Sequence, residues 1–265
     1  MMTLVSHGHS QALSTIEFVD VRKSFASLEV LTGVSASIPA GSTLCVLGSS
    51  GSGKSTLVRC INHLEGIQGG TIRVNDVEIR PGGLYRNGHA LSRAEVARYR
   101  TDVGMVFQSF NLFQHQTALK NLIEAPIGVL KWGRERAVKR ARELLSRVGL
   151  PDKEDAYPFE LSGGQQQRIA IARSLMLDPS VLLFDEPTSA LDPELTGEVL
   201  AVIRDLALVG RTSVIVTHEM SFAREVATHV MVLDRGVVTD FGLTQDVFEN
   251  PKSERTRNFL RMGSG

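Results

Sequence analysis

The feature that most constrains the fold is a short segment at residues 48–55, with the sequence G-S-S-G-S-G-K-S. It fits the pattern G-x-x-x-x-G-K-[S/T], follows an apolar β-branched run at 43–47, and precedes a stretch with the apolar spacing of a helix. In this context glycines let successive backbone N–H groups point at phosphate oxygens, with the positive end of a helix behind them. The segment therefore predicts a phosphate-binding loop between a strand and a helix.

The side chains of this loop have separate expected roles. Lys54 is expected to contact the β- and γ-phosphates of a nucleotide, and the Ser55 hydroxyl to ligate Mg²⁺. The alternative, a Gly/Ser-rich turn that matches by accident, is disfavoured by the flanking strand and helix. The residues expected to contact nucleotide here are Gly48, Ser49, Ser50, Gly51, Ser52, Gly53, Lys54, Ser55 and Thr56.

An acidic element should lie on a neighbouring strand, because a phosphate-bound metal needs oxygen ligands from the protein. The segment V-L-L-F-D-E at 181–186 supplies it, with two carboxylates where an apolar strand ends. Asp185 is expected to hold Mg²⁺ through water, and Glu186 to act as general base on the attacking water. Adjacent strand residues point to opposite faces, so both cannot be simple surface charges. The alternative, an acidic strand-end turn, is common for an isolated Asp-Glu pair but not beside a phosphate-binding loop.

The remaining chain alternates β-branched runs with helical stretches, which is typical of an α/β domain with a largely parallel sheet. The clearest helix is predicted over 134–148, where apolar residues recur on one face and Gly149 ends the pattern. Residues 109–178 are rich in helix pattern and predict a helical subdomain inserted in the α/β core. Strands are predicted at 16–21, 43–47, 71–74, 103–107, 181–184, 213–217 and 230–233.

Composition argues against several function classes. The 265 residues carry 29 Lys+Arg and 29 Asp+Glu, which argues against a nucleic-acid partner bound through a basic face. The longest apolar run, at 199–203, is shorter than the ~20 residues of a bilayer helix, and residues 1–14 lack a secretory signal pattern. Cys45 and Cys60 lack metal-ligand spacing and are expected in the core. We therefore expect a cytosolic protein.

A third motif, L-S-G-G-Q-Q-Q-R at 161–168, precedes Asp185 by one helix and a turn. With it, the chain resembles the ATP-binding cassette (ABC) family over nearly all of its length. The resemblance implies a P-loop NTPase (RecA-like) core with a mainly parallel sheet, an N-terminal antiparallel β portion and an inserted helical subdomain. It places one ATPase domain at 15–260, between a flexible tail at 1–14 and a short tail at 261–265.

The third motif, the signature of the family, starts a helix, so its donors form a second phosphate-binding terminus. One ATP cannot easily be held by two such termini of a single subunit. The resemblance implies a head-to-tail homodimer in which the signature of one subunit caps the ATP on the phosphate-binding loop of the other. The signature residues expected to contact ATP are Ser162, Gly163, Gly164 and Gln165.

Four further positions match the family by resemblance. Gln108 resembles the glutamine that contacts the metal and the attacking water. Asp192, in S-A-L-D at 189–192, resembles the loop aspartate at the dimer interface. His218 resembles the switch histidine that bonds the γ-phosphate, although alone it would be an ordinary strand-end histidine. Phe25 stands where the family places an aromatic ring on adenine, and a core phenylalanine is the alternative that stays open.

Four stretches, at 59–65, 104–113, 216–220 and 250–260, resemble the ATPase subunits of polar amino acid importers. That resemblance implies two integral-membrane permease subunits, an extracytoplasmic solute-binding protein and a peripheral location on the cytoplasmic face of the plasma membrane. Gln114 replaces a usual proline, and V-T-D-F-G at 238–242 replaces a more acidic segment, so no particular solute is predicted. The alternatives are another importer, a lipoprotein-release or export ATPase, and a soluble ABC ATPase acting on ribosomes or DNA.

The segment after Gln108 carries three large apolar residues, Phe110, Leu112 and Phe113, among polar ones. A loop that leaves an ATP site has little reason to be apolar unless it packs inward or meets a partner. Packing in the helical-subdomain core is one interpretation. Docking of a permease helix is the other, and it is the one that the resemblance implies.

Overall fold

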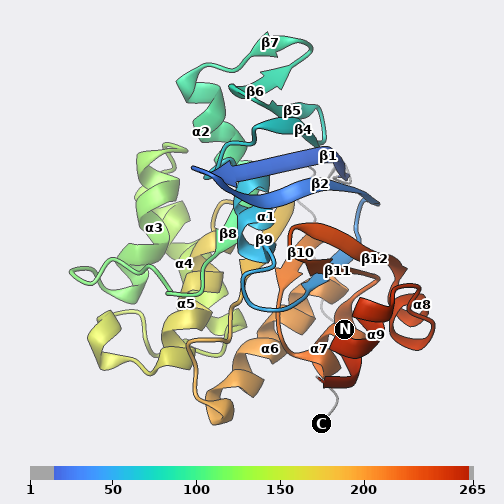
Figure 1. Cartoon of the computed structure of the whole chain (residues 1–265). Helices are drawn as coiled ribbons and strands as arrows, with labels where there is room; N and C mark the ends of the chain where they lie inside the picture. Colours follow the sequence, from blue (N-terminus) through green and yellow to red (C-terminus); the bar gives the residue numbers. More distant parts are fainter. Residues whose placement is uncertain (1–14, 263–265) are drawn as a thin grey trace.

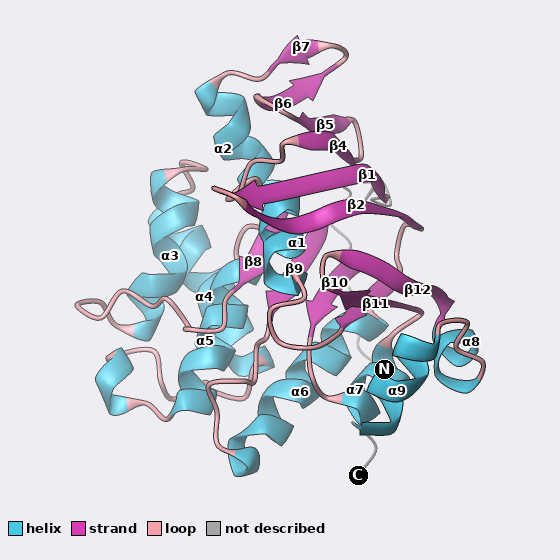
Figure 2. Cartoon of the chain, viewed as in Figure 1, coloured by secondary structure: helices cyan, strands magenta, loops and turns pink. Residues whose placement is uncertain are grey.

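The computed structural model describes residues 15–262, which form two β-sheets with helices around them (Figures 1 and 2). Helix α1 (Lys54–Ile61) packs between the two sheets and contacts strands of both. Its buried residues Leu57, Val58 and Ile61 share one apolar cluster with both sheets. The phosphate-binding loop therefore lies at the start of a helix that is fixed on two sides.

The central sheet has the strand order β12-β11-β3-β10-β9-β8, and only β12, at one edge, runs antiparallel to its neighbour. Every residue of β3, β9 and β10 is buried, which explains why these strands read as continuous apolar runs. The predicted mainly parallel sheet is confirmed. Its strands are β3 (Thr43–Leu47), β8 (Val103–Val106), β9 (Val181–Asp185), β10 (Thr212–Val216), β11 (His229–Asp234) and β12 (Val237–Leu243).

The second sheet is antiparallel, with the order β2-β1-β4-β5-β6-β7. The predicted strand at 16–21 is the first part of a longer one, and its hairpin partner β2 was not predicted. The antiparallel β portion expected near the N-terminus is confirmed. Its strands are β1 (Ile16–Phe25), β2 (Leu28–Ile38), β4 (Gly69–Val74), β5 (Val77–Arg80), β6 (Gly83–Arg86) and β7 (His89–Ala90).

Between β8 and β9 the chain is helical. Helix α3 packs against α4 and α5, and α4 buries Ala137, Ala141, Leu144 and Leu145. The helix predicted over 134–148 is α4, which ends one residue earlier. The limits 109–178 for a separate subdomain stay a prediction. The helices of this region are α3 (Ala118–Gly128), α4 (Arg134–Arg147), the 3₁₀ turn η1 (Pro158–Glu160) and α5 (Gly163–Leu175).

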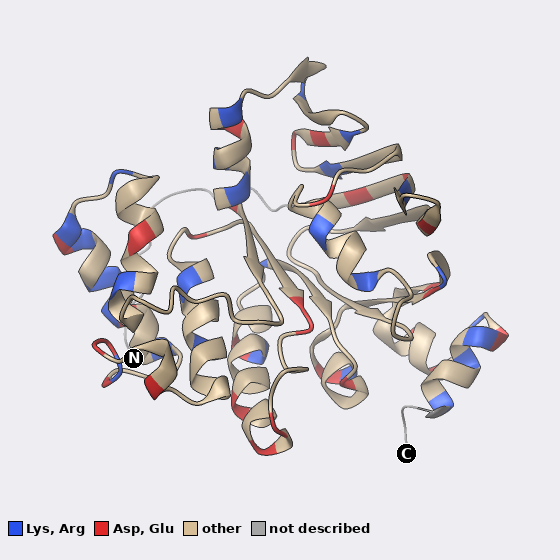
Figure 3. Ribbon diagram, turned by 60° about the vertical axis from the view of Figure 1, so that its left-hand side comes forward, with Lys and Arg blue, Asp and Glu red and all other residues tan. Residues whose placement is uncertain are grey.

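The remaining helices flank the sheets. Among residues 15–262, no helix combines the length and the apolar character that crossing a bilayer requires. Both basic and acidic residues are scattered over the antiparallel sheet and the helices (Figure 3). These helices are α2 (Arg93–Asp102), α6 (Pro193–Leu208), α7 (Met220–Val226), α8 (Thr244–Glu249) and α9 (Glu254–Met262).

Two predictions concern the chain ends and the cysteines. The tail predicted over 1–14 lies outside the described residues, and of the tail at 261–265 only 261 and 262 are described, as the end of α9. Cys45 and Cys60 are free and fully buried, on opposite sides of the central sheet in its two apolar clusters. The prediction that both cysteines pack in the core is confirmed.

Candidate functional site

The phosphate-binding loop connects β3 to α1, and two of its glycines have no room for a side chain. Gly48 has a φ of 146°, and a Cβ there would lie 2.0 Å from the Leu233 carbonyl oxygen. Gly53 has a φ of 103°, and its Cβ would lie 2.8 Å from the Val30 carbonyl oxygen. Both conformations are ones that only glycine adopts readily. The sharp curvature that the sequence predicts for this loop therefore depends on glycine at both positions.

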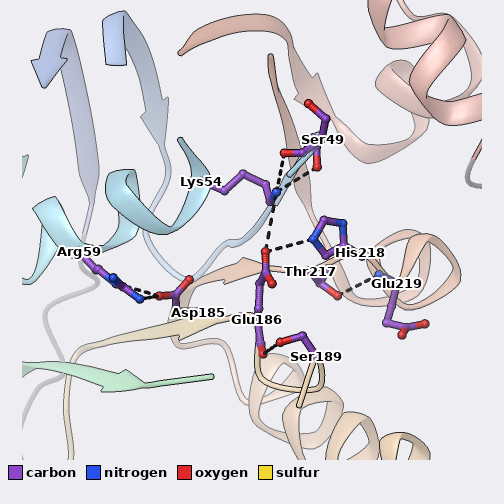
Figure 4. Close-up of polar contacts among 10 residues, drawn as sticks. Ser49, Lys54, Arg59, Asp185, Glu186, Ser189, Thr217, His218 and Glu219 are labelled. Carbon is purple, nitrogen blue, oxygen red and sulfur yellow. Dashed lines mark hydrogen bonds and ion pairs between the residues drawn. The ribbon is translucent and has the colours of Figure 1, made fainter. Parts of the chain in front are cut away.

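Lys54, the first residue of α1, is 4% exposed and directs its ammonium back into the loop. Its Nζ donates to the carbonyl oxygens of Gly48 at 3.0 Å and Ser49 at 2.9 Å, and lies 3.8 Å from a Glu186 carboxylate oxygen (Figure 4). Burial lowers the pKa of Lys54, and the charges of Glu186 and Asp185 oppose that effect. The Lys54 ammonium is therefore held at the phosphate-binding loop by hydrogen bonds to two of its carbonyls.

Asp185 is the last residue of β9 and is buried. Its Oδ2 accepts from Arg59 Nε and lies 3.0 Å from Arg59 Nη2 (Figure 4). Its other oxygen, Oδ1, is buried without a hydrogen-bond partner among residues 15–262. A buried carboxylate oxygen with no partner is costly unless another group satisfies it.

Glu186 lies one residue beyond β9 and has a left-handed backbone, with φ of 49°. Its N–H donates to the Val216 carbonyl, and its own carbonyl accepts from the Ser189 N–H and hydroxyl. Such a conformation costs about 1–3 kcal/mol and persists where surrounding contacts hold it. This conformation also corrects the sequence analysis. Strand alternation does not separate the carboxylates of Asp185 and Glu186, because β9 ends at Asp185. The turn at Glu186 separates them instead.

His218 and Glu186 form a pair beside Lys54. His218 follows β10 by two residues, and its Nε2 lies 3.0 Å from Glu186 Oε1. The Glu186 side chain is only 18% exposed, whereas that of His218 is about half exposed. The structure therefore gathers Lys54, Glu186 and His218, predicted from three separate motifs, into one cluster (Figure 4).

The residues present fit a nucleotide with a divalent cation. Ser52 Oγ, like Asp185 Oδ1, is a buried polar atom without a hydrogen-bond partner in the described chain. Around the Cβ position of Gly51, no atom of the described residues lies within 4 Å, so the outer turn of the loop has open space. Hydroxyl and carboxylate oxygens are the ligands that Mg²⁺ prefers. The metal contacts expected for Ser55, Gln108 and Asp185 stay predictions, and so do the nucleotide contacts of Ser50 and Thr56.

The signature motif begins helix α5, as its sequence predicts. Ser162 is the N-cap residue, with its Oγ accepting from the Gln165 N–H while the Gln165 side chain accepts from the Ser162 N–H. Gly164 packs closely against α6, because a Cβ there would lie 3.2 Å from Leu195 Cβ. Asp192 is the exposed N-cap of α6, and its side chain makes no capping bond. ATP contacts by Ser162, Gly163, Gly164, Gln165 and Asp192 stay predictions.

Two questions left open by the sequence concern aromatic residues. Phe25 ends β1 at a hairpin, is 43% exposed, and has Lys23 Nζ 4.4 Å from its ring centroid, so the core interpretation is wrong for it. In the segment after Gln108, Leu112 is buried in the core and Phe110 packs against it. Phe113 is 44% exposed. The core interpretation therefore holds for two of the three apolar residues and fails for Phe113.

Sequence reasoning missed Arg59, the partner of Asp185, and Asn121. The buried Asn121 side chain accepts from the Phe113 N–H and donates to the carbonyl oxygens of Phe113, Gln116 and Thr117. It therefore ties the exposed Phe113 to helix α3. The available signal was a polar residue inside the apolar pattern at 118–123.

The chain is similar to a known protein family, to named proteins and to a solved structure. Residues 31–189 match the family model described as ABC transporter. The chain is 53% identical to the histidine transport ATP-binding protein HisP of Pseudomonas aeruginosa, over 93% of this chain and 97% of that protein. It is 51% identical to the arginine transport ATP-binding protein ArgV of Corynebacterium glutamicum, over 92% and 96% respectively. It is also similar to the dimeric ATP-binding cassette MJ0796 in a post-hydrolysis state with ADP and Pi: TM-score 0.75, 31% identity, 86% of this chain and 98% of that one.

Proposed function

The chain belongs to the ABC transporter family, and on that premise we propose that it is the ATP-hydrolysing subunit of an importer for polar amino acids. The observation that carries the proposal is the cluster of Lys54, Glu186 and His218 at the phosphate-binding loop. Relatives named for arginine, histidine and glutamine transport, each about half identical to this chain, support the solute class.

The geometry supports a separate role in ATP hydrolysis for each of Lys54, Glu186 and His218. Lys54 exchanges the carbonyls of Gly48 and Ser49 for phosphate oxygens, which are stronger acceptors because they are charged. Glu186 accepts the proton of the attacking water. His218 Nε2 lies 3.0 Å from that carboxylate and can orient it. Ser55, Asp185 and Gln108 would hold Mg²⁺, which would neutralise part of the phosphate charge.

The second phosphate-binding terminus supports a dimer. Helix α5 is thirteen residues long and begins at the signature; Ser162 Oγ caps the Gln165 N–H, and the N–H groups of Gly163 and Gly164 lie before the first intrahelical bond. Anions bind favourably at such a terminus. The similarity to a dimeric cassette supports a head-to-tail homodimer, in which Ser162, Gly163, Gly164 and Gln165 of one copy close on ATP held by the other.

We expect this dimer to work with two integral-membrane permease subunits and, through them, with an extracytoplasmic solute-binding protein. The subunit would then lie on the cytoplasmic face of the inner membrane. Relatives named as permease ATP-binding proteins for octopine and nopaline, at 51% and 50% identity, support permease partners. The exposed Phe113 is the candidate contact with a permease helix.

The test is recovery of the permeases followed by transport. The tagged chain is purified from detergent-solubilised membranes of its host, and co-purified membrane proteins are identified by mass spectrometry. The complex is then reconstituted in proteoliposomes with labelled arginine, histidine and glutamine, with and without ATP. ATP-dependent uptake of a polar amino acid, absent with Lys54→Ala, is expected. Co-purification with an export or lipoprotein-release system, or with ribosomes, would contradict the proposal.

A further inference from the structure

The segment that follows the candidate metal contact Gln108 has an unusual backbone. Phe110 and Asn111 are consecutive non-glycine residues with left-handed φ values of 52° and 54°. L-residues visit this region mainly as single residues, because Cβ crowds the following carbonyl. Two in a row persist only where other contacts hold them. We call residues 107–113 the Gln108 loop.

One side chain of helix α5 binds both strained residues. Arg173 Nη1 donates to the Asn111 carbonyl oxygen at 2.8 Å, and Nη2 lies 3.4 Å from the Phe110 carbonyl oxygen. The guanidinium carbon also lies 5.6 Å from the centroid of the Phe113 ring. Both terminal nitrogens of Arg173 therefore bond to this turn, and burial lowers the pKa of Arg173.

The same helix also binds the loop on the other side of Gln108. The fully buried Gln167 donates from Nε2 to the Phe107 carbonyl oxygen at 3.2 Å. At the start of α5, a Cβ on Gly163 would lie 3.6 Å from Phe110 Cζ, so the Phe110 ring lies against the signature. The loop leaving β8 runs beside α5 in Figure 1. Gln108 is thus flanked on both sides by contacts to one helix.

We propose that Arg173 is a positioning residue that fixes the Gln108 loop to the signature helix, so that Gln108 and Phe113 take their places together. The planar guanidinium suits this role, because its fork can reach two adjacent carbonyls while its face meets a ring. The role rests on the proposed ATPase function. One contact would then hold both Gln108, the expected metal contact, and the exposed Phe113.

The test compares Arg173→Met with a rescue by Asn111→Gly. Methionine keeps the apolar stem and removes both donors. We expect kcat for ATP to fall at least tenfold and the Mg²⁺ concentration for half-maximal hydrolysis to rise at least threefold. ATP affinity should stay within twofold, because the contacts of Lys54 are untouched. Glycine at 111 adopts the left-handed conformation without strain. Adding Asn111→Gly to Arg173→Met should therefore restore at least half of the lost activity on a logarithmic scale.

Two further variants test whether the effect is specific to the Arg173 guanidinium. Arg136→Met is the matched control, since that arginine also stacks on a ring, 4.0 Å from the Trp132 centroid, but lies on α4. It should keep kcat within twofold. Arg173→Lys retains the charge without the fork, and should show the same Mg²⁺ defect in smaller measure. It replaces Arg173→Met if that variant fails to fold by circular dichroism.

Hydrogen exchange of the Gln108 loop gives a readout that needs no hydrolysis. Amides at 109–113 should exchange at least tenfold faster in Arg173→Met than in the wild-type chain. If the wild-type chain hydrolyses no ATP, the proposed function fails, and exchange alone decides the role of Arg173. Wild-type exchange in this segment overturns the positioning role. So does a loss of kcat that Asn111→Gly leaves unchanged, because a purely structural role of Arg173 would not respond to relief of strain at 111.

Discussion

Replacing Glu186 by glutamine should separate hydrolysis from nucleotide binding and from folding. The contacts that hold the left-handed turn at Glu186 involve its backbone N–H and carbonyl, which glutamine retains. The substitution removes the carboxylate that His218 Nε2 meets at 3.0 Å and Lys54 Nζ at 3.8 Å. Lys54 keeps two carbonyl acceptors. The free energy of unfolding should change by about 1 kcal/mol, or about 2–4 °C in Tm.

The catalytic effect of this substitution should be much larger. Loss of a general base costs about 10²–10⁴-fold, which corresponds to ~2.7–5.4 kcal/mol of transition-state stabilisation. ATP affinity should be equal or tighter, because a negative charge beside the phosphates disappears. Phosphate release at saturating Mg²⁺ and ATP, nucleotide binding and thermal unfolding are measured on the same preparation. A dimer should accumulate with ATP in size-exclusion chromatography.

The matched control is Glu219→Gln, whose carboxylate points away from the cluster in Figure 4. This variant should keep kcat within twofold of the wild-type chain. Glu186→Gln turnover within about threefold of wild type would refute the assignment of Glu186 as base. His218 would then be the first candidate for that role.

Three further predictions concern Lys54, Phe113 and the two cysteines. Lys54→Ala should abolish tight ATP binding, because the charge that faces the phosphates is lost; calorimetric titration that gives wild-type affinity would disprove the phosphate-binding assignment. Phe113→Ala should preserve hydrolysis by the free subunit while weakening permease association and uptake, with exposed Val129→Ala as control; unchanged uptake would exclude Phe113 from docking. Burial raises the pKa of the Cys45 and Cys60 thiols to about 12, so only about 10⁻⁴ of each is thiolate at pH 8. Iodoacetamide should label neither in the native protein and both in denaturant, and rapid native labelling would contradict their burial.

The parallel strands could be predicted because burial on both faces leaves a continuous apolar run, as in β9 and β10. Strand β2 could not be predicted by alternation. Its buried residues Leu31, Val34 and Ile38 are three and four positions apart, because register shifts interrupt its pairing with β1. That spacing is closer to a helix than to a strand. Helix α2 was missed for a different reason, since only Tyr99 of its side chains is buried.

Much of the candidate site lies in contiguous motifs, and these parts could be predicted from the sequence. The positive φ angles at Gly48 and Gly53 and the N-cap at Ser162 are local backbone features that the motifs predict. The contacts of Arg59 with Asp185 and of Arg173 with Asn111 join residues 126 and 62 positions apart. No local pattern specifies such pairs, because they depend on how α1 and α5 pack against the sheet and the Gln108 loop.

The proposed dimer joins the phosphate-binding loop of one copy to the signature of another in each ATP site. The direct measurement mixes two inactive variants, Lys54→Ala and Ser162→Arg, and follows ATP hydrolysis as their ratio changes. The arginine should block closure while leaving ATP binding to the monomer intact, since Ser162 is exposed at the start of α5. A mixed dimer then contains one site with both motifs intact and one with both damaged. Partial activity, maximal near equal proportions, is the predicted result. Activity in the mixture no higher than in either variant alone would contradict the shared site.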